Sequence, residues 1–396
     1  MKRTFPYAGL LSLAILCAAT LLALLFAEVI CRFIRPLSTV EYRMDADVGP
    51  LLAPSQRSRW VNEDYDVVVV TNSAGFHDIE RAVEKGSDDY RIVVLGDSYI
   101  EALQLPIAEG FTQQLERLLA RQVKGRNVEV INLGVSGSGP AQYYRILEKK
   151  GLAYKPDLVV MAVFPDNDFW DSDPDLSGAV FKPYYVMRPD DSLEYRPPQA
   201  ESVGSALRPW LRRSAFLHMV RQGIVALPLE RWLASFGLLA PAGGVQENSK
   251  HTPIPLGWSV YLRDPPATWL NAERLTLRMI REAQSISKNN SAAFLVVMIG
   301  SLPAVEERWD EVLAGYPGAK SMTWDFGRPI TLLQEFGKQW GFEVVNLTDS
   351  FQSDFRATGR SSAWPHDGHW NARGHRLAAE VVSAHLLHHQ QTYGLN

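Results

Sequence analysis

Two patterns of apolar positions alternate along most of the chain. Short runs rich in Val and Ile are typical of buried parallel strands, and they fall at residues 91–95, 128–133, 158–164, 293–299 and 342–347. Apolar residues spaced three and four positions apart predict helices, at residues 111–122, 141–150, 268–288, 330–340 and 372–389. This alternation predicts an α/β fold, a three-layer α/β/α sandwich around a five-stranded parallel sheet of the flavodoxin-like kind.

Two regions fall outside this alternation. From about residue 44 to residue 90 the chain contains a polar stretch, one predicted strand at 66–71 and a turn-like Asn-Ser-Ala-Gly. We expect residues 35–90 to form a neck that packs on the main domain, residues 91–390. Residues 171–257 are rich in Pro, Gly and aromatic residues. We expect an insertion there, a possible lid, with amphipathic segments at 215–227 and 229–239.

The N-terminal region carries an apolar run of a different kind. Residues 8–27 contain no charge and no proline, and about 20 such residues can cross a membrane as a helix. A cleaved signal peptide has a shorter apolar region and a small-x-small cleavage site, whereas this run continues through residues 28–30. We therefore expect an uncleaved anchor in the inner membrane, with residues 1–34 as cytoplasmic stub and membrane helix and residues 8–30 in contact with the membrane.

We expect the rest of the chain to lie in the periplasm, although the flanking charges do not fix this orientation. Basic residues stand on both sides of the run, at Lys2, Arg3, Arg32, Arg35 and Arg43. Both cysteines, Cys17 and Cys31, lie in or beside the run, and a remaining chain without thiols suits an oxidising space. The net charge of −4 provides no basic field for phosphates, so we expect no nucleic-acid partner.

Candidate chemistry collects where the predicted strands end, because functional groups of such sheets lie beyond the carboxyl ends of the strands. Gly96, Asp97 and Ser98 directly follow the first strand. A serine hydroxyl there can act as a nucleophile if a base activates it and if donors face the oxygen that becomes negative. Taken alone, the tripeptide fits an ordinary turn with Ser98 as a helix N-cap better than it fits catalysis.

The next two strand ends offer hydrogen-bond donors. Gly134 lies in a glycine-rich loop after the second strand, where its amide could donate to an oxyanion. Asn167 follows the third strand and could point its side-chain amide at the same site, although a turn cap explains it equally well. The glycine-rich loop fails a dinucleotide-binding fingerprint because of Gln142, and it fails a nucleophile elbow because of Ser138.

A base and its partner precede the last helix. Residues two apart in an extended stretch project to the same side, so the Asp367 carboxylate could reach one nitrogen of His369 and leave the other for Ser98. Asp168 remains an alternative partner for His369. His366, His369 and His375 could instead bind a metal, but no cysteine or spaced carboxylate set completes a tetrahedral site. We expect no metal and no cofactor.

Together the blocks Gly96-Asp97-Ser98, Gly134, Asn167-Asp168 and Asp367-x-His369 resemble those of the SGNH/GDSL hydrolases, over residues 72–385. The resemblance implies that Ser98 is the nucleophile, His369 the base and Asp367 its orienter. It also implies an oxyanion hole made of the Ser98 amide, the Gly134 amide and the Asn167 side chain. The segment Asn72-Ser73-x-Gly75-Phe76 is similar to the neck of anchored bacterial members.

Two positions depart from the family pattern. Pro165 stands where the third block usually has glycine, and one residue instead of two separates Asp367 from His369. The shorter spacing is similar to that of the alginate O-acetylation proteins, which transfer acetyl groups to polysaccharide outside the cytoplasm.

We therefore expect an enzyme that passes an acyl group, expected to be acetyl, from Ser98 to water or to a sugar hydroxyl. The expected substrate is an acylated carbohydrate or other ester of the cell-envelope glycan, and the expected setting is a glycan-modifying complex of the envelope. The alternative is a catalytically inactive glycan-binding or scaffold protein, against which the intact Ser-His-Asp set argues.

Overall fold

The chain divides into two compact units, Met1–Thr39 with Glu201–Ala242, and Val40–Ala200 with Gly243–Asn396. The computed structural model describes residues 7–34, 38–178, 181–198, 214, 216–217, 220 and 254–395. The predicted amphipathic segments at 215–227 and 229–239 therefore lie outside the described residues, apart from 216–217 and 220. The prediction of a lid stays a prediction.

In the first unit the N-terminal apolar run forms one helix, α1 (Tyr7–Ile34). Its segment Leu11–Arg32 is 22 residues long with a mean hydropathy of 2.6, so it is long and apolar enough to cross a membrane or to act as a signal sequence. Glu28 on this helix accepts hydrogen bonds from Ser214 Oγ at 2.7 Å and from the Phe216 N–H at 3.0 Å.

The second unit is built on a five-stranded parallel sheet with the order β11-β10-β7-β5-β6. The strands are β5 (Asp89–Leu95), β6 (Asn127–Asn132), β7 (Leu158–Val163), β10 (Ala293–Met298) and β11 (Glu343–Asn346). Each lies within two residues of a predicted strand at both ends, so the predicted fold class is confirmed. The order reverses at β5, and the crevice between β5 and β7 is where such sheets place their functional groups.

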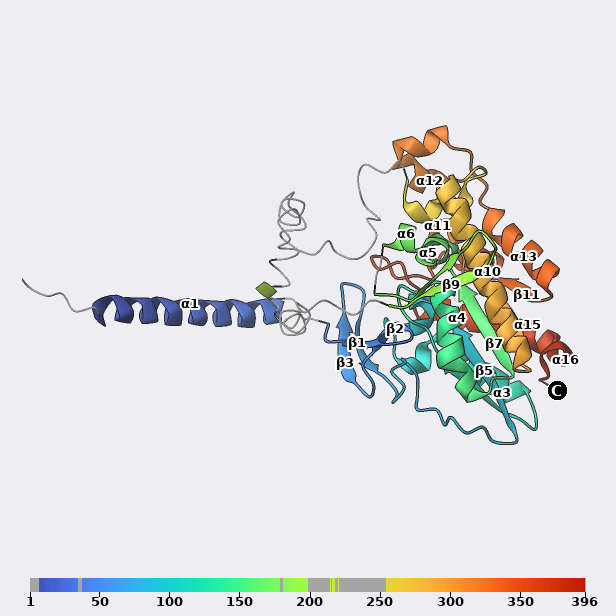
Figure 1. Ribbon diagram of the computed structural model, residues 1–396, viewed down its shortest axis with the longest axis horizontal. Helices are drawn as coiled ribbons and strands as arrows, with labels where there is room; N and C mark the ends of the chain where they lie inside the picture. The colour runs from blue at the N-terminus through green and yellow to red at the C-terminus, as the bar shows by residue number, and fades with distance from the viewer. Residues whose placement is uncertain are drawn as a thin grey trace, which may run out of the picture. The chain divides into compact units, whose positions relative to one another are not determined.

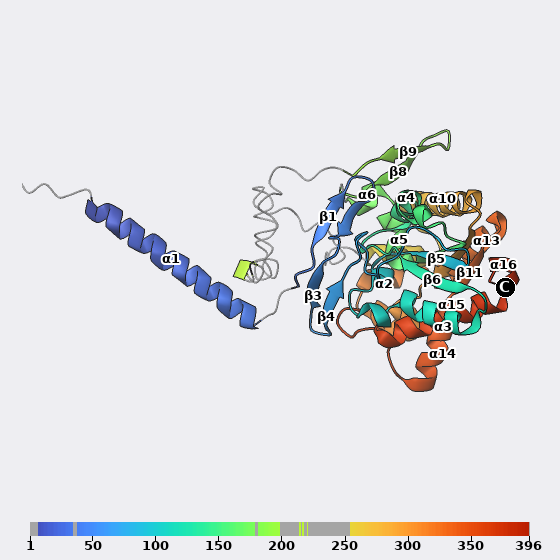
Figure 2. The same ribbon diagram turned by 90° about the horizontal axis from the view of Figure 1, so that it is seen from below.

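Helices cover both faces of this sheet, as Figure 2 shows from below. One face carries α4 (Pro140–Lys149), α10 (Ala267–Asn289) and α13 (Arg328–Trp340), and the other carries α3 (Phe111–Gln122) and α15 (Ala372–His388). Each of these five helices was predicted. Along β5, Val93 and Leu95 pack into one core and Ile92 and Val94 into the other, which explains why the strands read as unbroken apolar runs.

Shorter elements connect these layers, and Figure 1 follows them along the chain by colour. They are α2 (Ser98–Glu101), α5 (Pro165–Asp171), α6 (Pro174–Ser177), α11 (Leu302–Val305), α12 (Trp309–Ala314), α14 (Thr348–Thr358) and α16 (Gln390–Tyr393). Within the predicted insertion, the described part holds α6 and an antiparallel pair, β8 (Tyr184–Met187) and β9 (Leu193–Arg196).

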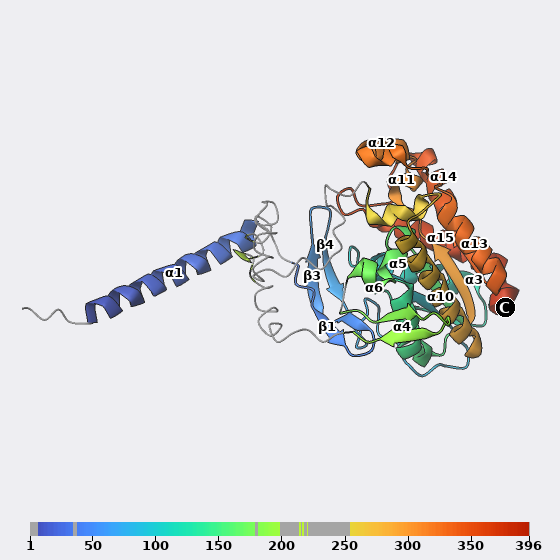
Figure 3. The same cartoon turned by 45° about the horizontal axis from the view of Figure 1, so that its top comes forward.

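The neck contains more structure than its sequence indicated. The predicted strand at 66–71 is β4 (Asp66–Val70), which pairs with an unpredicted strand, β3 (Arg57–Val61). A second antiparallel pair, β1 (Tyr42–Asp45) and β2 (Gly49–Leu52), precedes it. Figure 3 shows these neck strands at one end of the second unit, opposite the C-terminus. The three unpredicted strands have four or five residues each, and β1 and β3 contain no fully buried residue, so their sequence carries too short a pattern to be recognised.

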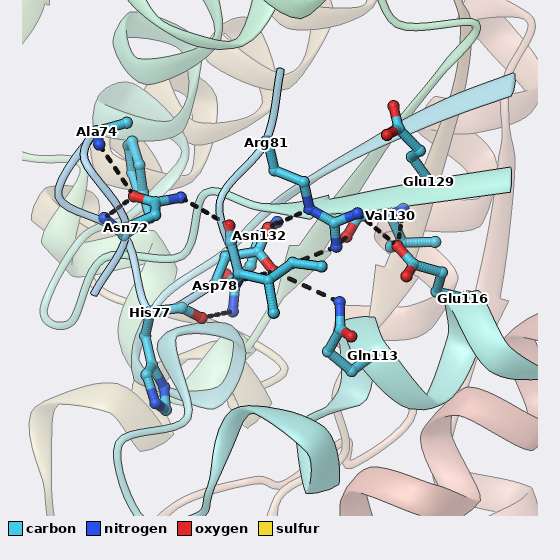
Figure 4. A network of polar contacts seen from close by, with 12 residues as sticks. Asn72, Ala74, His77, Asp78, Arg81, Gln113, Glu116, Glu129, Val130 and Asn132 are labelled. Atoms are coloured by element: carbon cyan, nitrogen blue, oxygen red, sulfur yellow. Dashed lines mark hydrogen bonds and ion pairs between the residues drawn. The ribbon is translucent and has the colours of Figure 1, made fainter. Parts of the chain in front are cut away.

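The neck is joined to the sheet by a buried polar network (Figure 4). Arg81 pairs with Asp78 at 3.0 Å and with Glu116 at 2.7 Å, and the side chains of Arg81 and Asp78 are 4% and 0% exposed. Arg81 also donates to the Val130 carbonyl at 2.8 Å, and Asp78 accepts the Asn132 N–H at 3.1 Å. Burial raises the pKa of Asp78, although Arg81 stabilises its charge.

We predict that Arg81→Met lowers the free energy of unfolding by about 3–5 kcal/mol, because it leaves the Asp78 carboxylate buried without its partner. Urea unfolding of the full chain in detergent, followed by near-ultraviolet circular dichroism, measures this change. Arg59→Met is the matched control: its partner Asp66 is about half exposed, so losing this ion pair should have little effect. Equal losses from the two variants would contradict the role assigned to the buried pair.

Candidate active site

Three neighbouring strand ends and one C-terminal loop meet around Ser98. The chain leaves β5 at Leu95 and enters α2 at Ser98, and β6 and β7 flank β5 on either side. Asn167 is carried by α5, which begins directly after β7. The parallel strands therefore place Ser98 and Asn167, which are far apart in the sequence, at the same edge of the sheet.

The structure brings the three predicted triad side chains into one chain of hydrogen bonds. His369 Nε2 lies 2.7 Å from Ser98 Oγ, and His369 Nδ1 contacts Asp367 Oδ1. With Asp367 ionised, Nδ1 carries the imidazole proton and Nε2 accepts the hydroxyl hydrogen of Ser98. The arrangement is the one in which a neutral histidine removes a proton from serine.

A tight loop holds His369 in place. The Trp364 N–H donates to the His369 carbonyl at 2.8 Å, and the Gly368 N–H donates to the Trp364 carbonyl at 2.9 Å. Gly368, the single residue between Asp367 and His369, has a φ of +81°, a conformation that glycine adopts without strain. This geometry accommodates the short spacing that departs from the family pattern.

The electrostatics of the loop favour an ionised aspartate and a basic histidine. Burial of the imidazole disfavours its charged form, but the hydrogen bond and charge of Asp367 hold the pKa of His369 above its ordinary value. Burial would raise the pKa of Asp367, but hydrogen bonds from His369 and Tyr65 hold it below its usual value. The Tyr99 ring lies 4.9 Å from the imidazole and closes one side of it.

Asp97 is a buried carboxylate next to Ser98 in the chain, 1% exposed. It caps α2 by accepting the Tyr99 N–H at 2.9 Å, and it accepts Asn167 Nδ2 at 2.8 Å. Burial raises the pKa of Asp97. Because an amide nitrogen carries two hydrogens, this bond orients the Asn167 side chain and leaves one N–H to donate.

The predicted oxyanion donors differ in availability. The Ser98 N–H, at the start of α2, donates to no group in the described part of the chain. The Gly134 N–H donates to Asn132 Oδ1 at 2.9 Å in this structure, and its role as an oxyanion donor stays a prediction. Its glycine is required for another reason, since a Cβ would collide with the Glu101 nitrogen. Further along this loop, the Gly137 N–H meets no acceptor among the described residues.

The alternative partner of the histidine lies elsewhere. Asp168 is fully buried, where it accepts the Tyr143 hydroxyl at 2.8 Å and the Phe164 N–H at 2.8 Å. Burial, together with the nearby charge of Asp97, raises the pKa of Asp168 well above its usual value. The structure therefore assigns the bond to His369 to Asp367 and gives Asp168 a role in holding α4 against the strand end.

The three histidines that were weighed as a metal set do not converge. His366 Nδ1 lies 2.7 Å from Asp64, and its side chain is 66% exposed. His375 is buried on α15, where its Nδ1 accepts the Phe111 N–H at 3.1 Å, and burial lowers its pKa to about 3. Each of these two has a partner of its own, and His369 is engaged by Ser98 and Asp367.

Sequence reasoning missed a group of residues in the turn between β3 and β4. Tyr65 and Asn62 contact the Asp367 carboxylate through Tyr65 Oη and Asn62 Nδ2. Asp64 accepts the backbone N–H groups of His366 and Asp367. A polar Asn-Glu-Asp-Tyr turn has no feature that separates it from an ordinary exposed turn, so only the folded chain identifies these contacts.

We predict that Asp367→Asn lowers kcat for ester turnover by about 10³–10⁴-fold with little change in KM, because the charge that stabilises the imidazolium is lost. Asp168→Asn should leave the hydrogen bond between Ser98 and His369 intact and reduce kcat far less. Steady-state kinetics of the two variants side by side measure this difference. The assignment of the orienter is wrong if Asp367→Asn keeps full activity while Asp168→Asn loses it.

No family model and no curated protein matches this chain. Solved structures that resemble it include a protein described as a GDSL-like lipase, from Parabacteroides merdae, at 12% identity and a TM-score of 0.38 over 80% of this chain and 100% of the other. A second is a catalytic mutant of an acetylxylan esterase from Geobacillus stearothermophilus, at 11% identity and a TM-score of 0.38 over 74% and 92%. A third is an alpha/beta hydrolase enzyme from the metagenome of Lake Arreo, at 14% identity and a TM-score of 0.39 over 79% and 99%. The lipase, esterase and hydrolase activities named here are those of the similar proteins.

Proposed function

We propose that this protein is a serine esterase or O-acyltransferase of the SGNH/GDSL type that works through an acyl-Ser98 intermediate. The observation that carries the proposal is the aligned set of Ser98, His369 and Asp367, with the serine oxygen 2.7 Å from a histidine whose other nitrogen meets a carboxylate. A serine needs such a base to become a nucleophile.

In the proposed reaction, Ser98 Oγ attacks the acyl carbonyl while His369 Nε2 removes its proton. Asp367 stabilises the imidazolium, and the carbonyl oxygen that becomes negative is stabilised by the Ser98 N–H and the free N–H of Asn167. The alcohol leaves with the proton from His369, and Ser98 stays acylated. Water or a second alcohol then attacks the acyl-serine, with His369 as base, and restores Ser98.

We propose that the acyl group is acetyl and that the substrate is glycan of the cell envelope. Three features support this: the resemblance of the Asp367-x-His369 block to acetyl-transferring proteins, the partly open site, where the His369 side chain is 29% exposed, and the anchor helix α1. In this proposal α1 spans the inner membrane, the catalytic unit lies in the periplasm, and the protein belongs to a glycan-modifying complex. Hydrolysis and transfer use the same residues.

The second candidate is an inactive glycan-binding or scaffold protein. It gives no reason for a serine hydroxyl, an imidazole and a carboxylate to lie in line at a strand end. A binding protein would also gain nothing from a histidine whose pKa is raised by a partly buried aspartate.

We predict that Ser98→Ala and His369→Ala each lower the turnover of p-nitrophenyl acetate by the full chain in detergent by at least about 10³-fold, because each removes a group that the acyl-enzyme step requires. A fluorophosphonate probe should label the wild type and not Ser98→Ala. Ser87→Ala, an exposed serine just before β5, is the matched control and should keep full labelling and turnover. An unlabelled wild type would favour the scaffold alternative.

We predict that kcat/KM rises with pH through a midpoint above 6.5. Catalysis needs neutral His369, and the pKa of this group is raised, so its protonated and inactive form persists to a higher pH than for a free imidazole. A pH profile of p-nitrophenyl acetate turnover measures the midpoint. A midpoint below 6.5 would contradict the pairing of His369 with an ionised Asp367.

A further inference from the structure

We propose that the turn between β3 and β4, residues 62–65, is a positioning element of the catalytic triad, in which Tyr65 and Asn62 fix the Asp367 carboxylate. The inference rests on the proposed function, because it assigns a role to residues that act through Asp367. Under this proposal the neck contributes residues that position the catalytic triad.

The two oxygens of Asp367 have separate partners. Oδ1 faces the histidine, where it meets Nδ1 and accepts the His369 N–H at 3.2 Å. Oδ2 faces the neck, where it accepts the Tyr65 hydroxyl and, at 3.2 Å, Asn62 Nδ2. A carboxylate held at both oxygens cannot rotate about its last bond, so the neck determines the direction in which Oδ1 meets the imidazole.

The hydrogen of the Tyr65 hydroxyl has one available direction. Trp60 Nε1 donates to Tyr65 Oη at 3.2 Å, which makes that oxygen an acceptor on one side. The phenolic hydrogen is then left for Asp367. Tyr65 is 9% exposed and its ring lies 5.7 Å from the Trp364 ring, so packing against the loop that carries the triad also fixes the phenol.

Hydrogen bonds within the turn fix its own shape, and the turn also binds the backbone of the loop that carries Asp367. Asn62 Oδ1 accepts the N–H groups of Asp64 and Tyr65, at 2.8 and 3.1 Å, which leaves Asn62 Nδ2 to reach Asp367. Asp64, with a side chain only 4% exposed, accepts the N–H groups of His366 and Asp367 at 2.9 and 2.8 Å. One turn therefore holds the aspartate by its side chain and by its main chain.

The hydrogen bonds from the neck also affect how strongly the negative charge of Asp367 acts on His369. Tyr65 is neutral, so its hydrogen bond stabilises the ionised carboxylate and lowers the pKa of Asp367 without cancelling its charge. Without the Tyr65 donor, more of the negative charge of Asp367 faces His369. The imidazolium is then more stable, and the pKa of His369 rises further.

The test is Tyr65→Phe in the full chain in detergent, with p-nitrophenyl acetate as substrate. We expect kcat to fall about 10- to 100-fold with KM little changed, because the carboxylate loses its orientation. We also expect the acid limb of the kcat/KM profile to move to higher pH. An unchanged kcat and limb, or a fall in kcat without a shift of the limb to higher pH, would overturn the inference.

Asn62→Asp is a second variant that keeps the turn, because the new carboxylate retains an oxygen for the two N–H groups. It replaces the donor to Asp367 with a like charge, so we expect a larger fall in kcat than for Tyr65→Phe and a circular dichroism spectrum like that of the wild type. Full activity of Asn62→Asp would overturn the role of Asn62.

Tyr393→Phe is the matched control. It removes another phenol-to-carboxylate hydrogen bond, to Glu343, which begins β11 at the opposite end of the strands from Ser98. Figures 1 and 2 show α16, which ends at Tyr393, at the far end of the unit from the neck strands. We expect wild-type kinetics from it. Fluorophosphonate labelling of the wild type separates the two hypotheses: without labelling the proposed function fails, whereas with labelling and wild-type kinetics of Tyr65→Phe only the positioning role fails.

Discussion

The buried side chain of Asn132 links three of the elements that surround Ser98. Asn132 is the last residue of β6. Its Nδ2 donates to the His77 carbonyl in the neck at 3.1 Å and to the Ile100 carbonyl of α2 at 2.8 Å. Its Oδ1 accepts the Gly134 N–H in the next loop, and its own N–H reaches Asp78, the partner of Arg81. One side chain therefore joins the neck, the short helix that begins at Ser98, and the loop after β6. A side chain that lacks either the donor or the acceptor would leave buried main-chain groups unpaired, which costs more than the bond itself contributes.

The sheet and its covering helices could be predicted because their signal is local. A parallel strand buried on both faces must be apolar throughout, and a helix packed on one face must repeat every three or four residues, so β5 and α3 were predicted to within two residues. Ser98, Asp367 and His369 could be found for a related reason: each stands at the end of a recognisable element. The neck strands β1, β2 and β3 could not, because four or five residues beside polar turns carry too little pattern.

The features of the site that the sequence did not reveal have a different physical origin. Whether the Gly134 N–H is free depends on where the Asn132 amide points, and nothing in the local sequence determines that direction. The contacts of Tyr65 and Asn62 with Asp367 join positions 302 and 305 residues apart, so no spacing rule could reveal them. The spacing of one residue between Asp367 and His369 departs from the family pattern. It becomes understandable once Gly368 supplies a positive φ and the neck holds the second carboxylate oxygen.

The contact between the neck and Asp367 also has a consequence for the order of folding. Ser98 and His369 are 271 residues apart, and the turn that holds Asp367 lies still nearer the N-terminus. Contacts between such distant segments form late, after the loss of chain entropy has been offset by more local packing. During synthesis the neck, β5 and α2 are made first, and they can contact the C-terminal loop only after the end of the chain has been made. Ser98 therefore stays without His369 until the last part of the chain is in place, so under the proposed function a partly folded chain has no activated serine.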